Sequence, residues 1–308
     1  MASNPNNLIL HANGFDVARV AKSESVGSRA MYLGNNAAQY WIEVSGAGAG
    51  SKTPGEIVLD QHRISTLKFL AFKSFVSLGV GDGCRDIRFA EQLTFDERGV
   101  TYIAVDISEE LARSVVNRIG TRDALGFVAD FEDQTKDVAR QIGDLAKSPS
   151  VLVMFGGTIS NFEVKASKFL ADFLSSLLEE QAVLVEFPIL HNDWTEESEP
   201  RLNPKNYANS LRRLIGNAFQ VADIKSFVDR FDEFVNLSCE IEDGGHVRIE
   251  IRHKVVVSPR IITRRYNFDS LMGNPGFAAL GPRVSYLVPA RSDLVGVAGL
   301  LFRGQMQK

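Results

Sequence analysis

The sequence predicts a doubly wound α/β fold, in which helices cover both faces of a mostly parallel sheet. Three observations lead to this prediction. From residue 57 onward, short apolar segments alternate with stretches of helical periodicity, which is typical of a parallel sheet. A glycine-rich turn, 78–83, directly follows the first of these apolar segments. Acidic residues, Asp106 and Asp130, follow the next two.

The alternating part of the chain can be assigned segment by segment. Apolar positions at helical spacing predict a helix over 57–73, and a strand over 74–78 precedes the glycine-rich turn. Ser108 is a candidate N-cap for a helix after the second strand. The other predicted elements are a helix over 85–93, strands over 101–105, 126–129, 150–155 and 182–187, and a helix over 165–178.

Two regions break this alternation and predict a smaller α+β domain on the substrate side. In the first, short helices are expected over 8–41, and the small residues 45–51 follow as a linker or a mobile loop. In the second, 207–219 has a helical pattern, and 234–242 and 246–257 predict paired strands around the hairpin turn Asp243-Gly-Gly.

The doubly wound pattern then resumes, with a helix expected over 268–277 and strands over 284–288 and 294–302. The predicted boundaries are therefore 57–190 plus 256–308 for a cofactor-binding domain, and 1–56 plus 191–255 for a substrate-binding or lid domain.

Composition and charge disfavour several classes of protein. The net charge of −4 comes without a long basic block, which argues against a nucleic-acid partner. The three arginines within 260–265 form a local basic run, and a solvated strand face explains them about as well. The two cysteines, Cys84 and Cys239, fit neither a disulfide framework nor a zinc site, so we expect reduced thiols, a cytoplasmic location and no metal. A polar N-terminus and the lack of any stretch of 18 apolar residues predict no secretion signal and no membrane span.

The glycine-rich turn is the strongest candidate for a cofactor site. Its residues Gly79, Gly81 and Gly83 allow positive φ and close approach of a ligand to the backbone. Ligands of open α/β sheets bind beyond the carboxyl ends of the strands, where this turn is expected. A plain tight turn is the structural alternative. A nicotinamide-dinucleotide oxidoreductase is a further alternative, although its third glycine normally comes one residue later.

Two acids extend this candidate site. Asp106, at the end of the second strand, is suited to accept hydrogen bonds from both hydroxyls of a ribose. Asp130, at the end of the third strand, is suited to accept from the amino group of adenine, beside the apolar ring of Phe131. A strand-end acid that caps the next turn is the alternative for each one taken singly. Three successive strand ends of this kind indicate a nucleoside-containing cofactor.

The segment Phe155-Gly-Gly-Thr-Ile-Ser-Asn161-Phe162, after the fourth strand, resembles the histidine-specific methyltransferases of the ergothioneine pathway, which have a Gly-x-Thr-Ile-Gly-Asn-type motif here. The resemblance implies a class I methyltransferase fold, a Rossmann-like doubly wound sheet, with S-adenosylmethionine (SAM) as cofactor. It covers most of the chain from residue 57, with further matches at 78–85, Val105-Asp106, Asp130-Phe131, 209–214, Arg248-Ile-Glu250 and Gly276-Phe277. Only the Asn161 and Glu250 motifs are specific to the family.

The resemblance implies roles for individual residues. Asn161 would anchor the amino-acid end of the substrate, and Arg85 would face the methionine carboxylate of the cofactor. Glu250 would reach the substrate side chain, and is the candidate to orient the attacking nitrogen and accept its proton. Tyr32 and Tyr40 match two aromatic residues of the substrate pocket. The structural alternatives are loop bracing for Asn161, a solvated side chain for Arg85, and core packing for Tyr32 and Tyr40.

Two departures from the family pattern bear on the substrate. The family's Glu-x-Ser motif reads Glu250-x-Arg252 here, and 50–54 lacks the family's tyrosine. A carboxylate that contacts an imidazole can also pair with a guanidinium, and Glu186 and Asp193 are further candidate carboxylates, each also an ordinary strand-end or loop acid. We therefore expect N-methylation of a free amino acid in natural-product biosynthesis, first at the guanidino nitrogen of L-arginine, as in streptozotocin-type biosynthesis. The α-amine of L-histidine is the alternative, and a non-catalytic cofactor-binding protein and the oligomeric state stay open.

Overall fold

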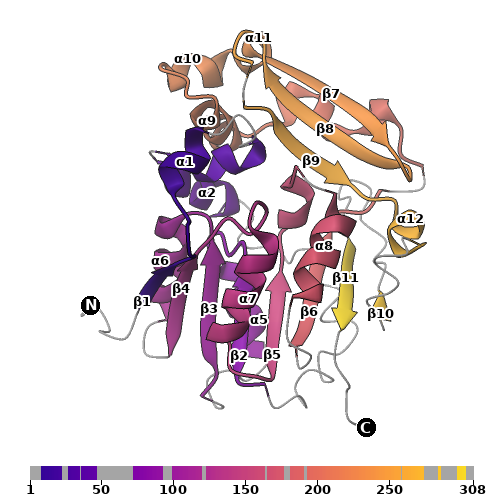
Figure 1. Ribbon diagram of the computed structural model, residues 1–308. Coiled ribbons are helices and arrows are strands. Elements are labelled where there is room, and N and C mark those ends of the chain that lie inside the picture. Colours follow the sequence, from indigo (N-terminus) through magenta and orange to yellow (C-terminus); the bar gives the residue numbers. More distant parts are fainter. Residues whose placement is uncertain are drawn as a thin grey trace.

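A computed structural model of the chain shows a large sheet flanked by helices and a small three-stranded sheet at the top of the view (Figure 1). The structure describes residues 8–22, 27–34, 36–46, 72–92, 99–119, 123–163, 165–176, 181–190, 193–257, 259–273, 284–285 and 297–302. The predicted helix over 57–73 lies outside these residues except for its last two positions, and so do most of the segments 45–51 and 286–296.

The large sheet has the described strand order β1-β4-β3-β2-β5-β6-β11-β10. The strands are β1 (Leu8–His11), β2 (Ser74–Leu78), β3 (Thr101–Asp106), β4 (Ala124–Val128), β5 (Ser150–Met154), β6 (Gln181–Phe187), β10 (Val284–Ser285) and β11 (Val297–Phe302). The strands from β1 to β6 are parallel, β11 is antiparallel to β6, and β10 is antiparallel to β11. From β2 the chain winds outward in one direction through β3 and β4, and in the other through β5 and β6. This arrangement confirms the predicted doubly wound sheet and places its switch point between β2 and β5.

Helices cover both faces of this sheet, and the strands are buried on both sides as a result. Residues alternate along β2: Phe75 packs with α5 (Cys84–Gln92) and α6 (Glu109–Ile119). Val76 and Leu78 pack on the opposite face with α7 (Thr135–Leu145) and α8 (Ala166–Ser175). All five residues of β2 are buried in consequence.

The second unit contains the antiparallel sheet β7-β8-β9, formed by β7 (Val235–Glu242), β8 (His246–His253) and β9 (Ile261–Arg265). The hairpin predicted at Asp243 joins β7 to β8. One apolar face of the sheet shares a hydrophobic cluster with the surrounding helices. These are α1 (Val17–Lys22), η1 (Gly27–Tyr32), α2 (Ala37–Gly46), α9 (Asn209–Ala218), α10 (Ile224–Asp229) and α11 (Phe231–Phe234). The remaining described elements are η3 (Thr158–Asn161), η4 (Glu196–Ser198), η5 (Pro200–Leu202), η6 (Pro204–Asn206) and α12 (Phe268–Gly273).

Two segments differ from expectation. Leu8–His11 was expected in a region of short helices, but it forms β1 and pairs in parallel with β4 in the large sheet. Ile261–Arg265, expected with the cofactor-binding domain, pairs with β8 in the small sheet. A solvated strand face, one of the two explanations offered for these arginines, is wrong for Arg264 and Arg265, which are only 3% and 6% exposed. Each forms ion pairs with a glutamate, Glu242 and Glu199 respectively, which is how a buried arginine is tolerated.

In the described part of the chain, every helix is too short or too polar to cross a membrane.

Candidate active site

A cavity lies beyond the carboxyl ends of the parallel strands, at the switch point of the sheet. Its volume is about 520 Å³, a figure that includes the solvent at its open mouth. Its described lining consists of Ser28, Arg29, Tyr32, Trp41, Gly79, Gly81, Asp106, Ile107, Ala129, Asp130, Phe131, Glu132, Thr158, Asn161 and Phe162. Four strand ends and the N-terminal segments η1 and α2 therefore meet at one site.

The glycine-rich turn forms part of this lining. Gly79, Gly81 and Gly83 have φ values of +68°, +53° and +68°, which residues with a side chain rarely adopt. A Cβ on Gly79 would lie 2.6 Å from Cγ2 of Thr158, and one on Gly81 would lie 2.6 Å from Nε1 of Trp41. A side chain at either position would therefore force its neighbour to shift. Gly83 does not line the described cavity, because it packs against α6 instead.

The Asp106 carboxylate faces the same cavity from the end of β3. It is 4% exposed and accepts hydrogen bonds from the backbone N–H groups of Ser108, at 2.9 Å, and Gly81, at 3.1 Å. Burial raises the pKa of Asp106 to about 6, and these hydrogen bonds act against that rise. A carboxylate offers about four acceptor positions, so acceptor capacity remains for the hydroxyl groups of a ligand.

The Asp130 carboxylate follows β4 and is also buried. Its Oδ1 accepts from the backbone N–H groups of Glu132 and Asp133, at 3.3 and 3.2 Å. Its Oδ2 pairs with Nη1 of Arg29 at 2.5 Å. Burial raises the pKa of Asp130, and the charge of Arg29 opposes this effect. Phe131, the next residue, adds an apolar wall to the cavity.

Asn161 reaches the cavity from η3, the turn after β5. Its Nδ2 donates to the hydroxyl of Tyr32 at 3.1 Å, and its Oδ1 lies 3.3 Å from the donating hydroxyl of Ser160. The ring of Tyr32 meets Trp41 edge-on, with centroids 5.0 Å apart. Burial raises the pKa of Tyr32, so its phenol is neutral at physiological pH. An amide and two aromatic rings therefore stand beside the glycine-rich turn.

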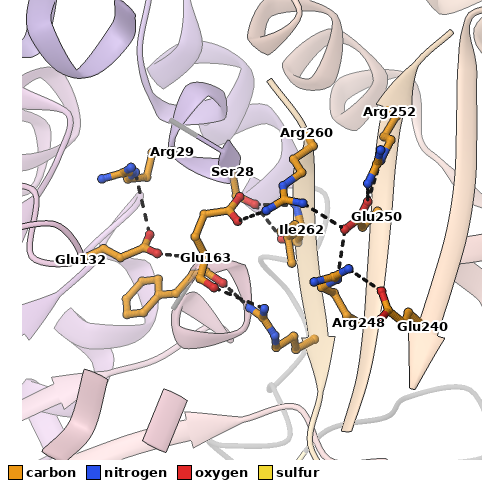
Figure 2. A network of polar contacts seen from close by, with 12 residues as sticks. Ser28, Arg29, Glu132, Glu163, Glu240, Arg248, Glu250, Arg252, Arg260 and Ile262 are labelled. Atoms are coloured by element: carbon orange, nitrogen blue, oxygen red, sulfur yellow. Dashed lines mark hydrogen bonds and ion pairs between the residues drawn. The ribbon is translucent and has the colours of Figure 1, made fainter. Parts of the chain in front are cut away.

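Glu250 lies on β8, surrounded by arginines (Figure 2). Nε and Nη2 of Arg252 contact its Oε2 at 2.7 and 2.5 Å. Nε of Arg248 lies 3.0 Å from its Oε1, and Nη1 of Arg260 lies 3.7 Å from the same oxygen. Glu250 and Arg252 do not contribute to the described lining of the cavity. A chain of contacts through Arg260, Glu163 and Glu132 connects Glu250 to that lining.

Four other predicted residues lie outside the described lining. Arg85 is close to the turn after β5, where a Cβ on Gly156 would lie 2.6 Å from its Nη1. Glu186 accepts from the backbone N–H of Gly156 at 3.1 Å and so braces the same turn. Tyr40 packs in the hydrophobic cluster of the second unit, and Asp193 is exposed on a loop.

Several lining residues were not predicted, above all Ser28, Arg29 and Trp41. Adjacent positions on a helix face directions about 100° apart, and on α2 this brings Trp41 rather than Tyr40 to the cavity. The different directions of positions 40 and 41 follow from the helical periodicity of the sequence. Ser28 and Arg29 carried no such signal. Four further lining residues are close in sequence to predicted motif residues but were not named as site residues themselves: Ile107, Glu132, Thr158 and Phe162.

The residues present fit an adenosyl cofactor. The buried carboxylate of Asp106 has acceptor capacity for a ribose, and that of Asp130 for an amino group. Phe131 and Ile107 supply apolar surface, and the space above Gly79 and Gly81 has the cradle shape that only glycine allows. Nowhere in the described residues do three or more His, Cys, Asp or Glu side chains gather in a way that could hold a metal ion.

Comparison with solved structures gives several methyltransferases of low sequence identity. An S-adenosylmethionine-dependent methyltransferase from Clostridium acetobutylicum is 12% identical, with 82% of this chain and 91% of that chain covered and a TM-score of 0.45. DesVI from Streptomyces venezuelae is 15% identical, with 88% of this chain and 99% of that chain covered and a TM-score of 0.42. CalS10, an amino pentose methyltransferase from Micromonospora echinaspora, is 9% identical, covering 85% and 96%, with a TM-score of 0.42. A search among curated proteins gave no match.

The family comparison is more specific. Residues 55–192 match the model described as histidine-specific, SAM-dependent methyltransferase. The matched segment contains strands β2 to β6 and, with them, the glycine-rich turn, Asp106, Asp130 and Asn161. The sheet has the class I methyltransferase arrangement that the resemblance implied, with antiparallel β11 inserted beside β6. The protein is therefore a SAM-dependent methyltransferase, and its residues 55–192 are similar to the histidine-specific methyltransferases.

Proposed function

We propose that the protein transfers the methyl group of SAM to a nitrogen of a free, cationic amino acid, with the guanidino nitrogen of L-arginine as the first candidate. The role proposed is a step in natural-product biosynthesis. The observation that carries the proposal is the position of Asn161, on the wall of the cavity that also contains Gly81 and Asp106. An amide beside the cofactor's binding residues suits the polar end of a small acceptor.

The side chains around Asn161 are arranged for binding and orientation. The bond to Tyr32 uses one of its two amide hydrogens and leaves the other, with acceptor capacity on Oδ1, for the carboxylate and amine of an amino acid. Because the Tyr32 phenol is neutral, its own hydrogen remains available as a donor. Trp41 and Tyr32 narrow the cavity with apolar surface and exclude water.

SAM supplies an electrophilic methyl group when bound. The protein's contribution is to hold the acceptor nitrogen in line with that group, and such positioning can provide several kcal/mol of rate acceleration, on the order of 7–11 in well-oriented systems. A guanidinium must also lose a proton before or during attack. A carboxylate near the nitrogen serves both purposes, because it orients the donor groups and accepts the proton.

Glu250 is our candidate for this carboxylate. Its Oε2 already binds the guanidinium of Arg252 through two nitrogens, so its surroundings accommodate this group. The side chain of Arg252 is 55% exposed, and its displacement by a substrate guanidinium therefore costs little burial. Arg248 and Arg260, which lie 3.0 and 3.7 Å from its Oε1, would remain beside the carboxylate during the exchange.

L-Histidine is the second candidate acceptor. It is favoured by the description of the family whose model matches residues 55–192, which is histidine-specific. The two acceptors differ in what they require from the enzyme: methylation of the α-amine needs the Asn161 end of the site to face the cofactor, whereas methylation of the guanidino group needs the Glu250 end to do so.

A mass-spectrometric assay with SAM and either L-arginine or L-histidine tests the proposal. We expect methylated arginine, and at least tenfold slower turnover in Glu250→Gln, a typical loss for a proton acceptor. Glu240→Gln is the matched control, because Glu240 lies on the adjacent strand, also binds Arg248 and is 63% exposed. Trimethylation of the histidine α-amine, with arginine unchanged, would contradict the arginine proposal and support histidine. An enzyme inactive on both but able to bind SAM would contradict amino-acid methylation.

A further inference from the structure

We propose that Arg29 is a positioning residue for the cofactor. Arg29 holds the carboxylate of Asp130 as a hydrogen-bond acceptor, and this acceptor selects the amino group of adenine over a carbonyl group at the same position of the base. The inference rests on the proposed role of Asp130 at the adenine end of the cavity. It adds a determinant that lies outside the segment shared with the methyltransferase family, since Arg29 precedes residue 55.

The contact between Arg29 and Asp130 is short and shielded from water. Nη1 of Arg29 lies 2.5 Å from Oδ2 of Asp130, with side-chain exposures of 13% and 4%. Nε of Arg29 lies 3.9 Å from Oε2 of Glu132, the contact drawn at the left of Figure 2. Both carboxylates line the cavity. Charges interact more strongly at such a site than on the surface, because less water screens them.

Asp130 has one acceptor position left for a ligand. Two backbone N–H groups use Oδ1, and Arg29 uses one position of Oδ2. An ionised carboxylate accepts only, at about four positions in all. The remaining position on Oδ2 therefore binds an amino group and repels a carbonyl oxygen. If Asp130 were protonated it could donate, and a carbonyl would no longer be rejected.

The charge balance at Asp130 depends on Arg29. The groups that face or neighbour Asp130 are the carboxylates of Glu132 and Asp133, the carboxylate of Asp106 across the cavity, and Arg29. Arg29 is the sole cationic side chain in the described lining. Burial raises the pKa of Asp130, and the charge of Asp133 raises it further, whereas Arg29 lowers it. Loss of Arg29 therefore favours the protonated carboxyl.

The backbone around Arg29 is fixed on both sides. The hydroxyl of Ser28 donates to the carbonyl of Ile262 on β9 and accepts from the N–H of the same residue, each at 2.7 Å. Tyr32, one turn later, is bonded to Asn161. Figure 2 shows Ser28 and Ile262 between Arg29 and Glu250. An arginine on so firmly attached a turn is suited to hold Asp130 in place.

The preference of the protein for an adenine ligand over a hypoxanthine ligand measures the proposed role of Arg29 directly. The probes are S-adenosylhomocysteine and S-inosylhomocysteine, which differ by an amino group and a carbonyl at the same position of the base. Their dissociation constants are measured by calorimetry at pH 6 and pH 8 for the wild type, Arg29→Gln, Arg29→Lys and Asp130→Asn. Arg19→Gln is the matched control, since Arg19 is an exposed arginine of the same N-terminal region whose side chain donates to the carbonyl of Gly14 at 3.5 Å.

We expect the wild type and Arg19→Gln to prefer the adenine probe by roughly tenfold or more, the usual effect of a hydrogen bond to a charged group. In Arg29→Gln the preference should fall toward that of Asp130→Asn, and more so at pH 6 than at pH 8, because Asp130 protonates more easily there. Arg29→Lys keeps the charge and should restore most of the preference. It also provides the test if Arg29→Gln does not fold, because a preference as low as that of Asp130→Asn in this variant would contradict the proposal.

Three results would overturn the inference. Equal weakening of both probes, with an unchanged preference, would make Arg29 a structural residue only. Unchanged affinities would show that it does not act on the cofactor. Tighter binding of the adenine probe to Arg29→Gln would show that Arg29 obstructs the base. None of these measurements involves a methyl acceptor, so they stand apart from the arginine-versus-histidine assay.

Discussion

The side-chain amide of Asn161 donates a 3.1 Å hydrogen bond to the hydroxyl of Tyr32, across 129 positions of the sequence. The bond joins the turn after β5, within the segment matched by the methyltransferase family, to η1, which precedes that segment. The hydrogen bond therefore connects the family-matched segment 55–192 to η1, which lies outside that match.

Asn161→Ala should raise the KM for the acceptor or abolish turnover, and leave the affinity for S-adenosylhomocysteine nearly unchanged. The reason is that the amide faces the proposed acceptor and not the cofactor acids. Tyr32→Phe removes the other half of the bond, and a double-mutant cycle should give a coupling of about 0.5–1.5 kcal/mol. Steady-state kinetics and calorimetry provide the measurements. Normal turnover in Asn161→Ala would show that the residue only braces its loop.

Asp106→Ala should weaken S-adenosylhomocysteine binding by about 2–4 kcal/mol, the range for two hydrogen bonds to a charged acceptor. Part of this loss reflects the turn itself, because Asp106 also accepts from the backbone of Gly81. Calorimetry measures the affinity, and the melting temperature of the free variant separates the turn from the ligand. Equal affinities for the wild type and the variant would refute the assignment of Asp106 to the ribose.

The affinity for S-adenosylhomocysteine should fall as the pH is lowered through about 6, the pKa to which burial raises Asp106. A protonated carboxyl is a poorer acceptor. The stability of the free protein should show the opposite sign, because the folded pKa lies above the ordinary value of 3.8. The folded state therefore binds more protons between these values, and the free energy of unfolding from this group decreases as pH rises from about 4 to about 6. Asp106→Ala should lose both the pH dependence of S-adenosylhomocysteine affinity and the pH dependence of stability that come from this carboxyl group.

Gly81→Ala should lower cofactor affinity and change the fluorescence of Trp41. An alanine would have to tolerate φ of +53° and a Cβ 2.6 Å from Nε1 of Trp41. Gly99→Ala is the matched control, with φ of +62° and open space around its Cβ. Both variants should lose about 1–3 kcal/mol of stability through backbone strain. A Gly81→Ala enzyme with wild-type emission and affinity would show that Trp41 does not depend on this glycine.

Arg265→Gln should lower the free energy of unfolding by about 3–5 kcal/mol, because it leaves the buried charge of Glu199 without its cation. Arg140→Gln, at a fully exposed pair with Asp137, should change it by less than about 1 kcal/mol. Urea denaturation compares the two. Similar effects in both variants would mean that water reaches Glu199 and that burial does not decide the cost.

The parts of the site that follow from the sequence are those fixed by local order. A strand, a turn and an acid follow one another in the chain, so Asp106, Asp130 and Asn161 could be assigned to one sheet edge from their positions in the sequence alone. Helix α7 was missed although Val138 and Ile142 stand at helical spacing on its buried face. That signal was present and unused.

Other features depend on contacts between distant segments. Nothing within Leu8–His11 distinguishes a four-residue edge strand, and its identity comes from pairing with β4. Arg264 and Arg265 look solvated in the sequence because their glutamates lie 22 and 66 positions away. Arg29 is placed at the cavity by the contacts of η1 with β9 and with Asn161, and no sequence motif indicates these contacts.

The two hydrogen bonds between Ser28 and Ile262 set an order of events during translation. A nascent chain that has passed residue 161 already contains the glycine-rich turn and the acids of the cavity, whereas the bonds from η1 to β9 cannot form until residue 262 has left the ribosome. At about 5–20 residues per second, this interval lasts roughly 5–20 seconds. During that time η1 can contact Asp130 and Asn161, but it lacks its anchor on β9.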